Sequence, residues 1–282
     1  MSFDTLIQGY SKPIDTIPVS LSPGGRLEHA VKAILFDVYG TLFISEAGDI
    51  GVAKRWAENN IIRIAGLLDK YAIPILPTVV LEEFFAEVEK SKERKAEQGL
   101  LYPEVRIEEI WRRVLGIEDM NIVKRFAVEY ELVVNPVYPM PHLKEMLLGF
   151  REKHIPMGVI SNAQFYTPCL FTALLGSDLA GLGFVEELLL FSYVLGYGKP
   201  SLTLFEEAAD RIERMGIERK EVLYVGNDML KDIFPAATIG FQTALFAGDG
   251  RSLNLREDDG RCNDLSPDIV VTDLIQVLEY IE

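Results

Sequence analysis

Residues 33–37, Ala-Ile-Leu-Phe-Asp, restrict the fold of this chain more than any other segment. Four consecutive apolar residues are typical of a strand covered on both faces, as in a parallel sheet. Gly40 and Thr41 then turn the chain. Asp37 is therefore predicted at the carboxyl end of a buried strand, where open α/β sheets bind their ligands. A carboxylate in that place can act as a nucleophile, or it can simply cap the following turn.

The second half of the chain alternates between short apolar segments and segments with helical periodicity. Strands are predicted at 157–160, 188–194, 222–225, 243–246 and 268–271. Helices are predicted at about 142–154, 201–215 and from 231 onward. Strands that alternate with helices predict an α/β fold with a doubly wound parallel sheet.

The segment between the first strand and this second half shows helical periodicity throughout. Helices are predicted at about 52–71, from an N-cap at Thr78 through the charged stretch 89–97, at 107–115 and at 122–132. The resulting domain boundaries are 1–30 for an N-terminal extension, 31–48 and 136–282 for the α/β core, and 49–135 for an inserted helical domain.

Composition excludes several classes of function. The chain has 282 residues and a net charge of −15, which disfavours binding to nucleic acid and to anionic membranes. Cys169 and Cys262 offer no disulfide framework and suit a reducing compartment. The N-terminus lacks the pattern of a signal peptide, and no apolar run approaches the roughly 20 residues of a membrane span. We expect a cytoplasmic protein that is a monomer or a homodimer.

Polar residues follow several of the predicted strands, and their side chains should meet at one edge of the sheet. Taken singly, each has an ordinary structural alternative, such as a helix cap, a surface lysine or a first-turn acid. The residues are Asp37, Ser161 with Asn162, Lys199, and Asn227 with Asp228 and Asp232.

This set of four motifs resembles the haloacid dehalogenase superfamily in order and spacing, and the resemblance extends from about residue 31 to the C-terminus. The helical insert stands where that family inserts its cap. The resemblance implies a Rossmann-like core with a mobile α-helical cap over the active site. It also implies that the chain is a hydrolase whose partner is a small anionic metabolite.

The resemblance assigns roles to individual residues. Asp37 would be the nucleophile, forming an ester that water hydrolyses, and Lys199 would neutralise the developing charge. Ser161 would donate a hydrogen bond to the substrate, near the backbone N–H groups of Asn162 and Ala163. Thr41 would hold the first loop.

In phosphatases of this family the fourth motif holds Mg²⁺ together with the first aspartate and a backbone carbonyl. The predicted ligands here are Asp37, the carbonyl of Tyr39, Asp228 and Asp232, with help from Asn227. Oxygen donors of this kind suit Mg²⁺. Asn227 stands where those phosphatases usually carry their first aspartate of the motif.

Position 39 departs from the phosphatase pattern, which has an aspartate there as general acid and base. Tyr39 has an ordinary pKa near 10, and the form Asp-x-Tyr-Gly-Thr looks like the metal-free 2-haloacid dehalogenases. Those enzymes use an arginine from the cap side to receive the halide or to bind the substrate carboxylate. Arg55 and Arg63 are candidates, but neither stands at the spacing from the first motif that this family would lead us to expect. Arg106 is a candidate for binding an anionic substrate group, or for a salt bridge with Glu104 or Glu108.

Three functions follow from these motifs. The leading hypothesis is Mg²⁺-dependent hydrolysis of a small phosphorylated metabolite, which the spacing of the fourth motif favours. Metal-free hydrolysis of a 2-haloacid is the alternative that Tyr39 favours. The third is a ligand-binding protein of the same fold with little turnover.

Overall fold

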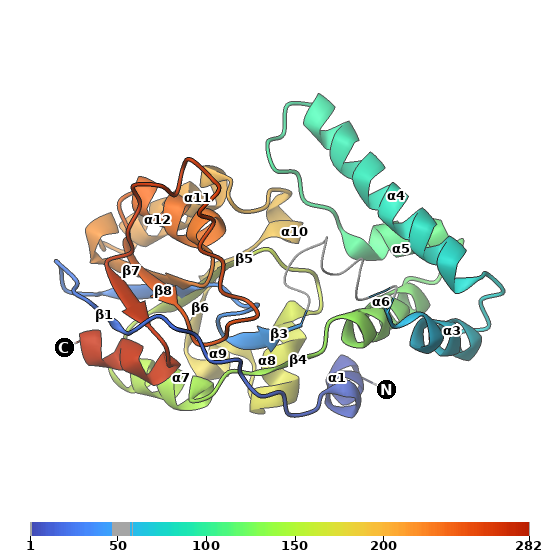
Figure 1. Ribbon diagram of the computed structural model, residues 1–282, viewed down its shortest axis with the longest axis horizontal. Helices are drawn as coiled ribbons and strands as arrows, with labels where there is room; N and C mark the ends of the chain where they lie inside the picture. Colours follow the sequence, from blue (N-terminus) through green and yellow to red (C-terminus); the bar gives the residue numbers. More distant parts are fainter. Residues whose placement is uncertain (1, 47–56, 58, 282) are drawn as a thin grey trace.

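A seven-stranded sheet forms the centre of the computed structural model, which describes residues 2–46, 57 and 59–281 (Figure 1). The strand order is β1-β9-β8-β7-β2-β5-β6, and every neighbouring pair is parallel except β1 with β9. The strands are β1 (Gly24–Gly25), β2 (Ala33–Phe36), β5 (Met157–Ser161), β6 (Phe184–Phe191), β7 (Val222–Gly226), β8 (Gln242–Phe246) and β9 (Ile269–Val271). The predicted doubly wound α/β fold is confirmed.

Helices cover both faces of this sheet because the apolar residues of β2 point to both sides. Ile34 and Phe36 pack against one set of helices, whereas Ala33 and Leu35 pack against the other. The first face carries α7 (Leu143–Glu152), α8 (Thr167–Leu175), α9 (Leu179–Leu182) and the 3₁₀ helix η3 (Leu274–Tyr280). The second face carries α11 (Leu202–Arg214) and α12 (Phe234–Thr238).

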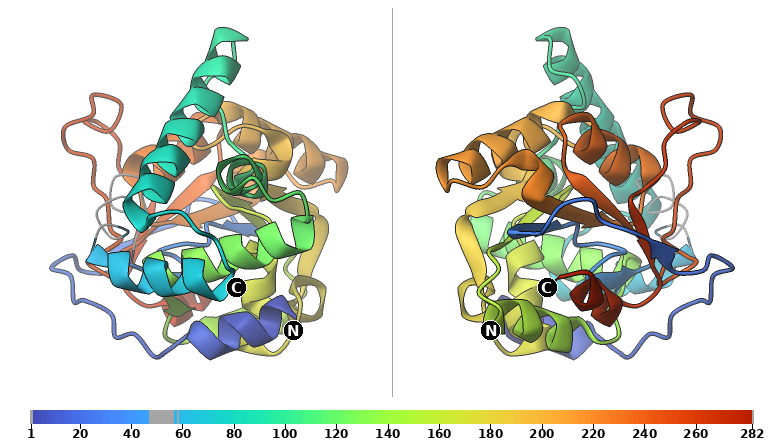
Figure 2. Two further views of the ribbon diagram at one scale, coloured as in Figure 1. Left: turned by 90° about the vertical axis from the view of Figure 1, so that its right-hand side faces the viewer. Right: turned by 90° about the vertical axis from the view of Figure 1, so that its left-hand side faces the viewer.

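A helical cap with its own apolar core lies beside the sheet domain (Figure 1). It consists of α3 (Ile61–Lys70), α4 (Pro77–Glu97), α5 (Ile107–Leu115) and α6 (Met120–Val134), and α4 projects beyond the rest of the molecule in Figure 2. Trp111 is buried at the centre of this core, where its ring lies 4.2 Å from that of Phe84 and 4.9 Å from that of Phe126.

The chain passes between core and cap through a two-stranded antiparallel sheet. Strand β3 (Phe43–Ser45) leads out of the core, and β4 (Val137–Pro139) leads back. Ser45 donates a hydrogen bond of 2.9 Å to the amide oxygen of Asn135. The predicted boundary near residue 48 lies outside the described residues, as do Arg55 and Trp56.

Several predicted elements differ from those observed. Thr78 lies inside α4, whose N-cap is Leu76 with Pro77 following it, a position that suits proline. The predicted strand 188–194 is β6, and its last three residues belong to the short helix α10 (Ser192–Leu195). After β7, which is preceded by the 3₁₀ turn η1 (Arg219–Glu221), the chain forms the π-helical turn η2 (Met229–Ile233) before α12.

The N-terminal extension contains a helix that the sequence analysis missed, α1 (Phe3–Tyr10). It packs on α8 of the core and α6 of the cap, and its residues Leu6 and Ile7 are buried. The extension then runs along the core to β1, which pairs with β9 (Figure 2). Of the helices described, none is long and apolar enough to cross a membrane.

Candidate active site

Three neighbouring parallel strands bring the polar motifs to one edge of the sheet. Asp37 follows β2, Ser161 ends β5, and Asn227 follows β7. Because β2 lies between β5 and β7, these carboxyl ends are adjacent. Lys199 reaches the same place from the turn that precedes α11.

Lys199 lies between two carboxylates. Its Nζ is 2.7 Å from Oδ1 of Asp37 and 2.5 Å from Oδ1 of Asp232. The exposed fractions of these side chains are 3%, 10% and 1% respectively. Burial alone would lower the pKa of Lys199, but the two carboxylates outweigh it and raise that pKa. Lys199 is therefore a permanent cation beside the predicted nucleophile.

Tyr224 completes this cluster and was missed by the sequence analysis. Its hydroxyl lies 3.0 Å from Oδ1 of Asp232, 3.0 Å from the carbonyl oxygen of Ile160 and 3.3 Å from Nζ of Lys199. A tyrosine in an otherwise aliphatic buried strand was the available signal, because a buried phenol usually finds a hydrogen-bond partner. Tyr224 fixes Asp232 and Lys199 relative to β5.

Asp232 serves as the anchor of Lys199. Its second oxygen, Oδ2, accepts hydrogen bonds from the backbone N–H groups of Asn227 at 3.1 Å and Asp228 at 3.0 Å. The turn η2 folds the carboxylate back under the end of β7, where a Cβ on Gly226 would lie only 2.4 Å from it. Since both oxygens are engaged within the protein, this arrangement argues against the predicted role of Asp232 as a metal ligand.

Asp228 caps the turn that follows it. Its Oδ1 accepts hydrogen bonds from the N–H groups of Leu230 at 2.9 Å and Lys231 at 3.0 Å, so it caps η2. Arg256 approaches the same carboxylate at 2.5 Å and 3.0 Å from two of its nitrogens. A carboxylate that is already paired with a guanidinium is a poor metal ligand, and no spacing pattern in the sequence indicates Arg256 as the partner of Asp228.

The first and fourth motifs are tied together through Asn227. Its Oδ1 accepts a hydrogen bond of 3.0 Å from Thr41, and its Nδ2 donates one of 2.6 Å to the carbonyl of Ser252. Gly40 has a φ of +84°, and a Cβ there would lie 2.7 Å from Cβ of Ser252. The turn after Asp37 therefore requires glycine, and Thr41 holds this turn as its predicted role requires.

The surroundings of Tyr39 do not suit a general acid or base. Its hydroxyl shares a hydrogen bond of 2.9 Å with that of Thr167. Burial, and then the charge of Glu131, raise the pKa of Tyr39 far above its ordinary value. The phenol stays protonated, so it cannot replace the aspartate that phosphatases carry at this position.

Asn162 positions Lys199. Its Oδ1 accepts a hydrogen bond of 2.7 Å from the backbone N–H of Lys199, and its Nδ2 lies 3.3 Å from the carbonyl oxygen of the same residue. The N–H of Ala163 donates to Ser192 at 2.9 Å rather than pointing to a ligand. Ser161, by contrast, has a buried hydroxyl without a hydrogen-bond partner within the described residues, which favours a role in ligand binding.

Arg106 of the cap forms the predicted salt bridge with Glu108, at 3.1 Å, and its side chain is 59% exposed. This pairing favours the structural interpretation of Arg106 over the anion-binding one. Arg63 lies within hydrogen-bond distance of Asn60 and of the carbonyl of Val133 on the cap.

The charges at this edge of the sheet do not cancel. Among the described residues whose ion pairs meet here, three carboxylates, those of Asp37, Asp228 and Asp232, face two cations, Lys199 and Arg256. The cluster thus carries one excess negative charge in a largely buried place. A phosphate ester would add further negative charge, so its binding here would be aided by an additional cation.

Three oxygen donors can serve such a cation: the second carboxylate oxygen of Asp37, the carbonyl of Tyr39 and the amide oxygen of Asn227, which has a second lone pair beside the one that accepts from Thr41. Mg²⁺ commonly uses one or two carboxylates and keeps several waters, so these donors fit it. Within the described part of the chain, no cluster of three or more acidic, histidine or cysteine side chains is arranged as a metal centre.

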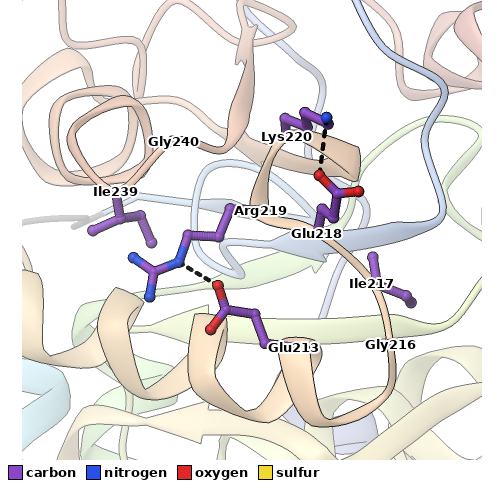
Figure 3. A pocket seen from close by; sticks show the side chains of 8 residues that line it. All are labelled: Glu213, Gly216, Ile217, Glu218, Arg219, Lys220, Ile239 and Gly240. Atoms are coloured by element: carbon purple, nitrogen blue, oxygen red, sulfur yellow. Dashed lines mark hydrogen bonds and ion pairs between the residues drawn. The ribbon is translucent and has the colours of Figure 1, made fainter.

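A separate surface hollow of about 600 Å³ lies near the amino end of β7, by the turn η1 (Figure 3). Its charged residues pair with one another, Arg219 with Glu213 at 2.8 Å and Lys220 with Glu218 at 2.9 Å. The polar motifs lie at the opposite, carboxyl ends of the strands, so this hollow is separate from the candidate site.

Asp232 predicts a pH dependence of stability. Burial raises its pKa to about 6, against 3.8 ordinarily, although Lys199 opposes the shift. Between these values the folded state keeps a proton that the unfolded chain has lost, so this contribution to stability is lost as the pH rises from about 4 to 6. Denaturant unfolding of the wild type and of Asp232→Asn should show that the free energy of unfolding of the wild type, relative to that of the variant, falls across this pH range. A difference that grows with pH would contradict the shift.

Comparisons with known proteins match most of this chain. The family model of haloacid dehalogenase-like hydrolases matches residues 31–240. A glyceraldehyde 3-phosphate phosphatase of Methanocaldococcus jannaschii is 26% identical over 234 residues, which are 81% of this chain and 90% of that protein.

Two solved structures share the fold. One is a 2-haloacid dehalogenase from Pseudomonas syringae pv. Tomato, with a TM-score of 0.54 and 21% identity over 89% of this chain and 97% of that one. The other is a phosphatase from Thermococcus onnurineus, with a TM-score of 0.53 and 17% identity over 88% and 97% of the two chains. At these identities the two structures show a common fold alone.

Proposed function

Since this chain belongs to the haloacid dehalogenase-like hydrolase family, we propose that it hydrolyses a small phosphorylated metabolite through an ester on Asp37. The observation that carries the proposal is the placement of Lys199 between Asp37 and Asp232, at 2.7 Å and 2.5 Å. This cation lies where charge would develop during attack by Asp37. The similarity to a phosphatase supports a phosphate ester as the substrate.

The reaction has two steps. A carboxylate oxygen of Asp37 attacks phosphorus, the bond from phosphorus to the ester oxygen breaks, and the departing alkoxide takes a proton from water. Ser161 donates its hydroxyl proton in a hydrogen bond to a phosphoryl oxygen, while Lys199 neutralises charge on Asp37 and the phosphoryl group. Water then attacks phosphorus, releasing phosphate and restoring Asp37.

A divalent cation would assist this reaction by neutralising the phosphoryl oxygens. Asp37, the carbonyl of Tyr39 and the amide oxygen of Asn227 would hold it. Asp228 and Asp232 are not proposed as ligands, because both oxygens of each carboxylate already accept hydrogen bonds within the protein, whereas only one oxygen of Asp37 is paired with Lys199.

A 2-haloacid is the second candidate substrate, and the environment of Tyr39 favours it. Halide leaves without a proton, so a phenol that stays bonded to Thr167 would not hinder the reaction. Asp37 would displace halide from C2, and water would then hydrolyse the alkyl ester to give a 2-hydroxyacid. The excess negative charge of the site is also less unfavourable for a monoanion than for a phosphate dianion.

Binding of Mg²⁺ to the metal-stripped protein tests the first candidate. Asn227→Asp adds a carboxylate beside Asp37, so we expect the affinity for Mg²⁺ to rise by about 10-fold in calorimetry, because affinity follows the charge of the ligand set. Asp228→Asn is the matched control and should leave the affinity unchanged. Weaker binding in Asp228→Asn than in wild type would return Asp228 to the ligand set.

Turnover separates the candidate substrates. Purified wild type should hydrolyse phosphate monoesters in a Mg²⁺-dependent manner and leave 2-chloropropionate intact. Haloacid turnover in the presence of a chelator would instead select the second candidate. Affinity for either class of compound without turnover would identify a binding protein.

A further inference from the structure

A cap segment, residues 102–107, contacts two loops of the active site. It ends at the first residue of α5 and lies against the turn 196–198, which leads directly to Lys199. The N–H of Gly198 donates to the carbonyl of Tyr102 at 2.7 Å, and the N–H of Glu104 donates to the carbonyl of Gly196 at 2.9 Å. This short antiparallel pairing joins the cap to the backbone that carries the catalytic cation.

Gln164 joins the same cap segment to the second motif. It stands three residues after Ser161, and its amide makes two hydrogen bonds to the cap backbone. Nε2 donates to the carbonyl of Val105 at 3.0 Å, and Oε1 accepts from the N–H of Ile107 at 3.0 Å. Ile107 is the first residue of α5, whose own N-cap residue supplies no side-chain bond. Gln164, a residue of the α/β core domain, therefore provides the hydrogen-bond acceptor for a backbone N–H that would otherwise be unpaired at the start of a cap helix.

Ser192 provides a second link. Its buried hydroxyl accepts a hydrogen bond of 2.9 Å from the N–H of Ala163 and lies 2.9 Å from Oε2 of Glu104 on the cap. The Ser192 hydroxyl donates to Glu104, so the order of donors runs from Ala163 through Ser192 to Glu104. The backbone after Ser161 thus depends on the position of the cap.

We infer that Gln164 and Ser192 are positioning residues that hold the cap segment 102–107 against the loops of Ser161 and Lys199, so that docking of this segment and the order of the site are coupled. Gln164, Ser192 and the lysine turn thus all contact residues within this one short cap segment. Loss of the Gln164 bonds should lower the fraction of protein with the cap docked. Apparent substrate affinity falls in proportion to that fraction, so KM should rise while kcat at saturation changes little.

Hydrogen–deuterium exchange of purified protein tests this inference without reference to activity. Gln164→Leu should accelerate exchange of peptides spanning 102–115 by about 10-fold, from the loss of two neutral hydrogen bonds. Gln8→Leu is the control, because Gln8 likewise donates to a backbone carbonyl, that of Ala173, but this bond joins α1 to α8. Ser192→Ala should accelerate the same peptides.

Exchange in these peptides that is unchanged in both variants, or no faster than in Gln8→Leu, would overturn the inference. The kinetic part rests on the proposed hydrolase activity, and it predicts a KM several-fold above wild type with kcat retained. A fall in kcat alone would also overturn it. If wild type itself shows no turnover, the proposed function fails while the exchange result still decides the inference.

Discussion

Replacing Asp37 by Asn is expected to lower kcat by at least about 10⁴-fold, because a carboxamide oxygen cannot form the ester on which both candidate reactions depend. The substitution keeps the size of the side chain and removes its charge. Lys199 retains Asp232 as a partner at 2.5 Å, so the variant should fold. Steady-state assays with the substrate found for the wild type measure the effect.

Mass spectrometry of the intermediate gives this prediction a second readout. In acid-quenched wild type, the peptide containing Asp37 should carry the mass of a phosphoryl or carboxyalkyl group, and in Asp37→Asn it should not. Turnover in H₂¹⁸O separates the two chemistries. Attack of water on phosphorus places ¹⁸O in the released phosphate, whereas hydrolysis of an alkyl ester at its carbonyl carbon places ¹⁸O in Asp37.

Asp273→Asn is a suitable control, since Asp273 pairs with His142 away from the candidate site. It should keep wild-type turnover. An Asp37→Asn variant with activity near that of the control would exclude a covalent mechanism at Asp37, and the site would then need another nucleophile or direct attack by water.

The sequence predicted the placement of the main groups because that placement follows from topology. A run of apolar residues ending in Asp37, and similar runs ending in Ser161 and before Asn227, define parallel strands whose carboxyl ends share one edge. The structure has these strands as neighbours, in the order β7-β2-β5. No knowledge of side-chain contacts is needed for this step.

Roles that depend on which atoms touch could not be predicted in the same way. Asp228 and Asp232 have the spacing of a metal motif, yet the structure directs them to Arg256 and Lys199. Arg256 lies 28 positions beyond Asp228 in a loop without periodicity, so spacing carries no information about this pair. The helix α1 was missed although Ser2 caps it and Asp4 stands in its first turn, because a helix of eight residues depends mainly on burial, here against α8 and α6.

Lys199→Met should have the largest effect on stability. It removes the cation that separates Asp37 from Asp232, whose side chains are only 10% and 1% exposed. Breaking a buried ion pair by deleting one partner typically costs about 3–5 kcal/mol, because the remaining charge is left uncompensated. Urea unfolding at pH 7 measures the loss. Activity should fall by about 10²–10³-fold, the usual effect of removing a group that stabilises the transition state.

A second substitution shows whether electrostatics causes this loss. Combining Lys199→Met with Asp232→Asn removes one of the two carboxylates that would otherwise repel each other, so the double variant should recover part of the stability. Activity should not recover, because Asp37 still lacks its neighbouring cation. If the double variant is no more stable than the single one, the loss comes from packing around the lysine chain. In that case Asp232 is not the electrostatic counterpart of Lys199 that the 2.5 Å contact indicates.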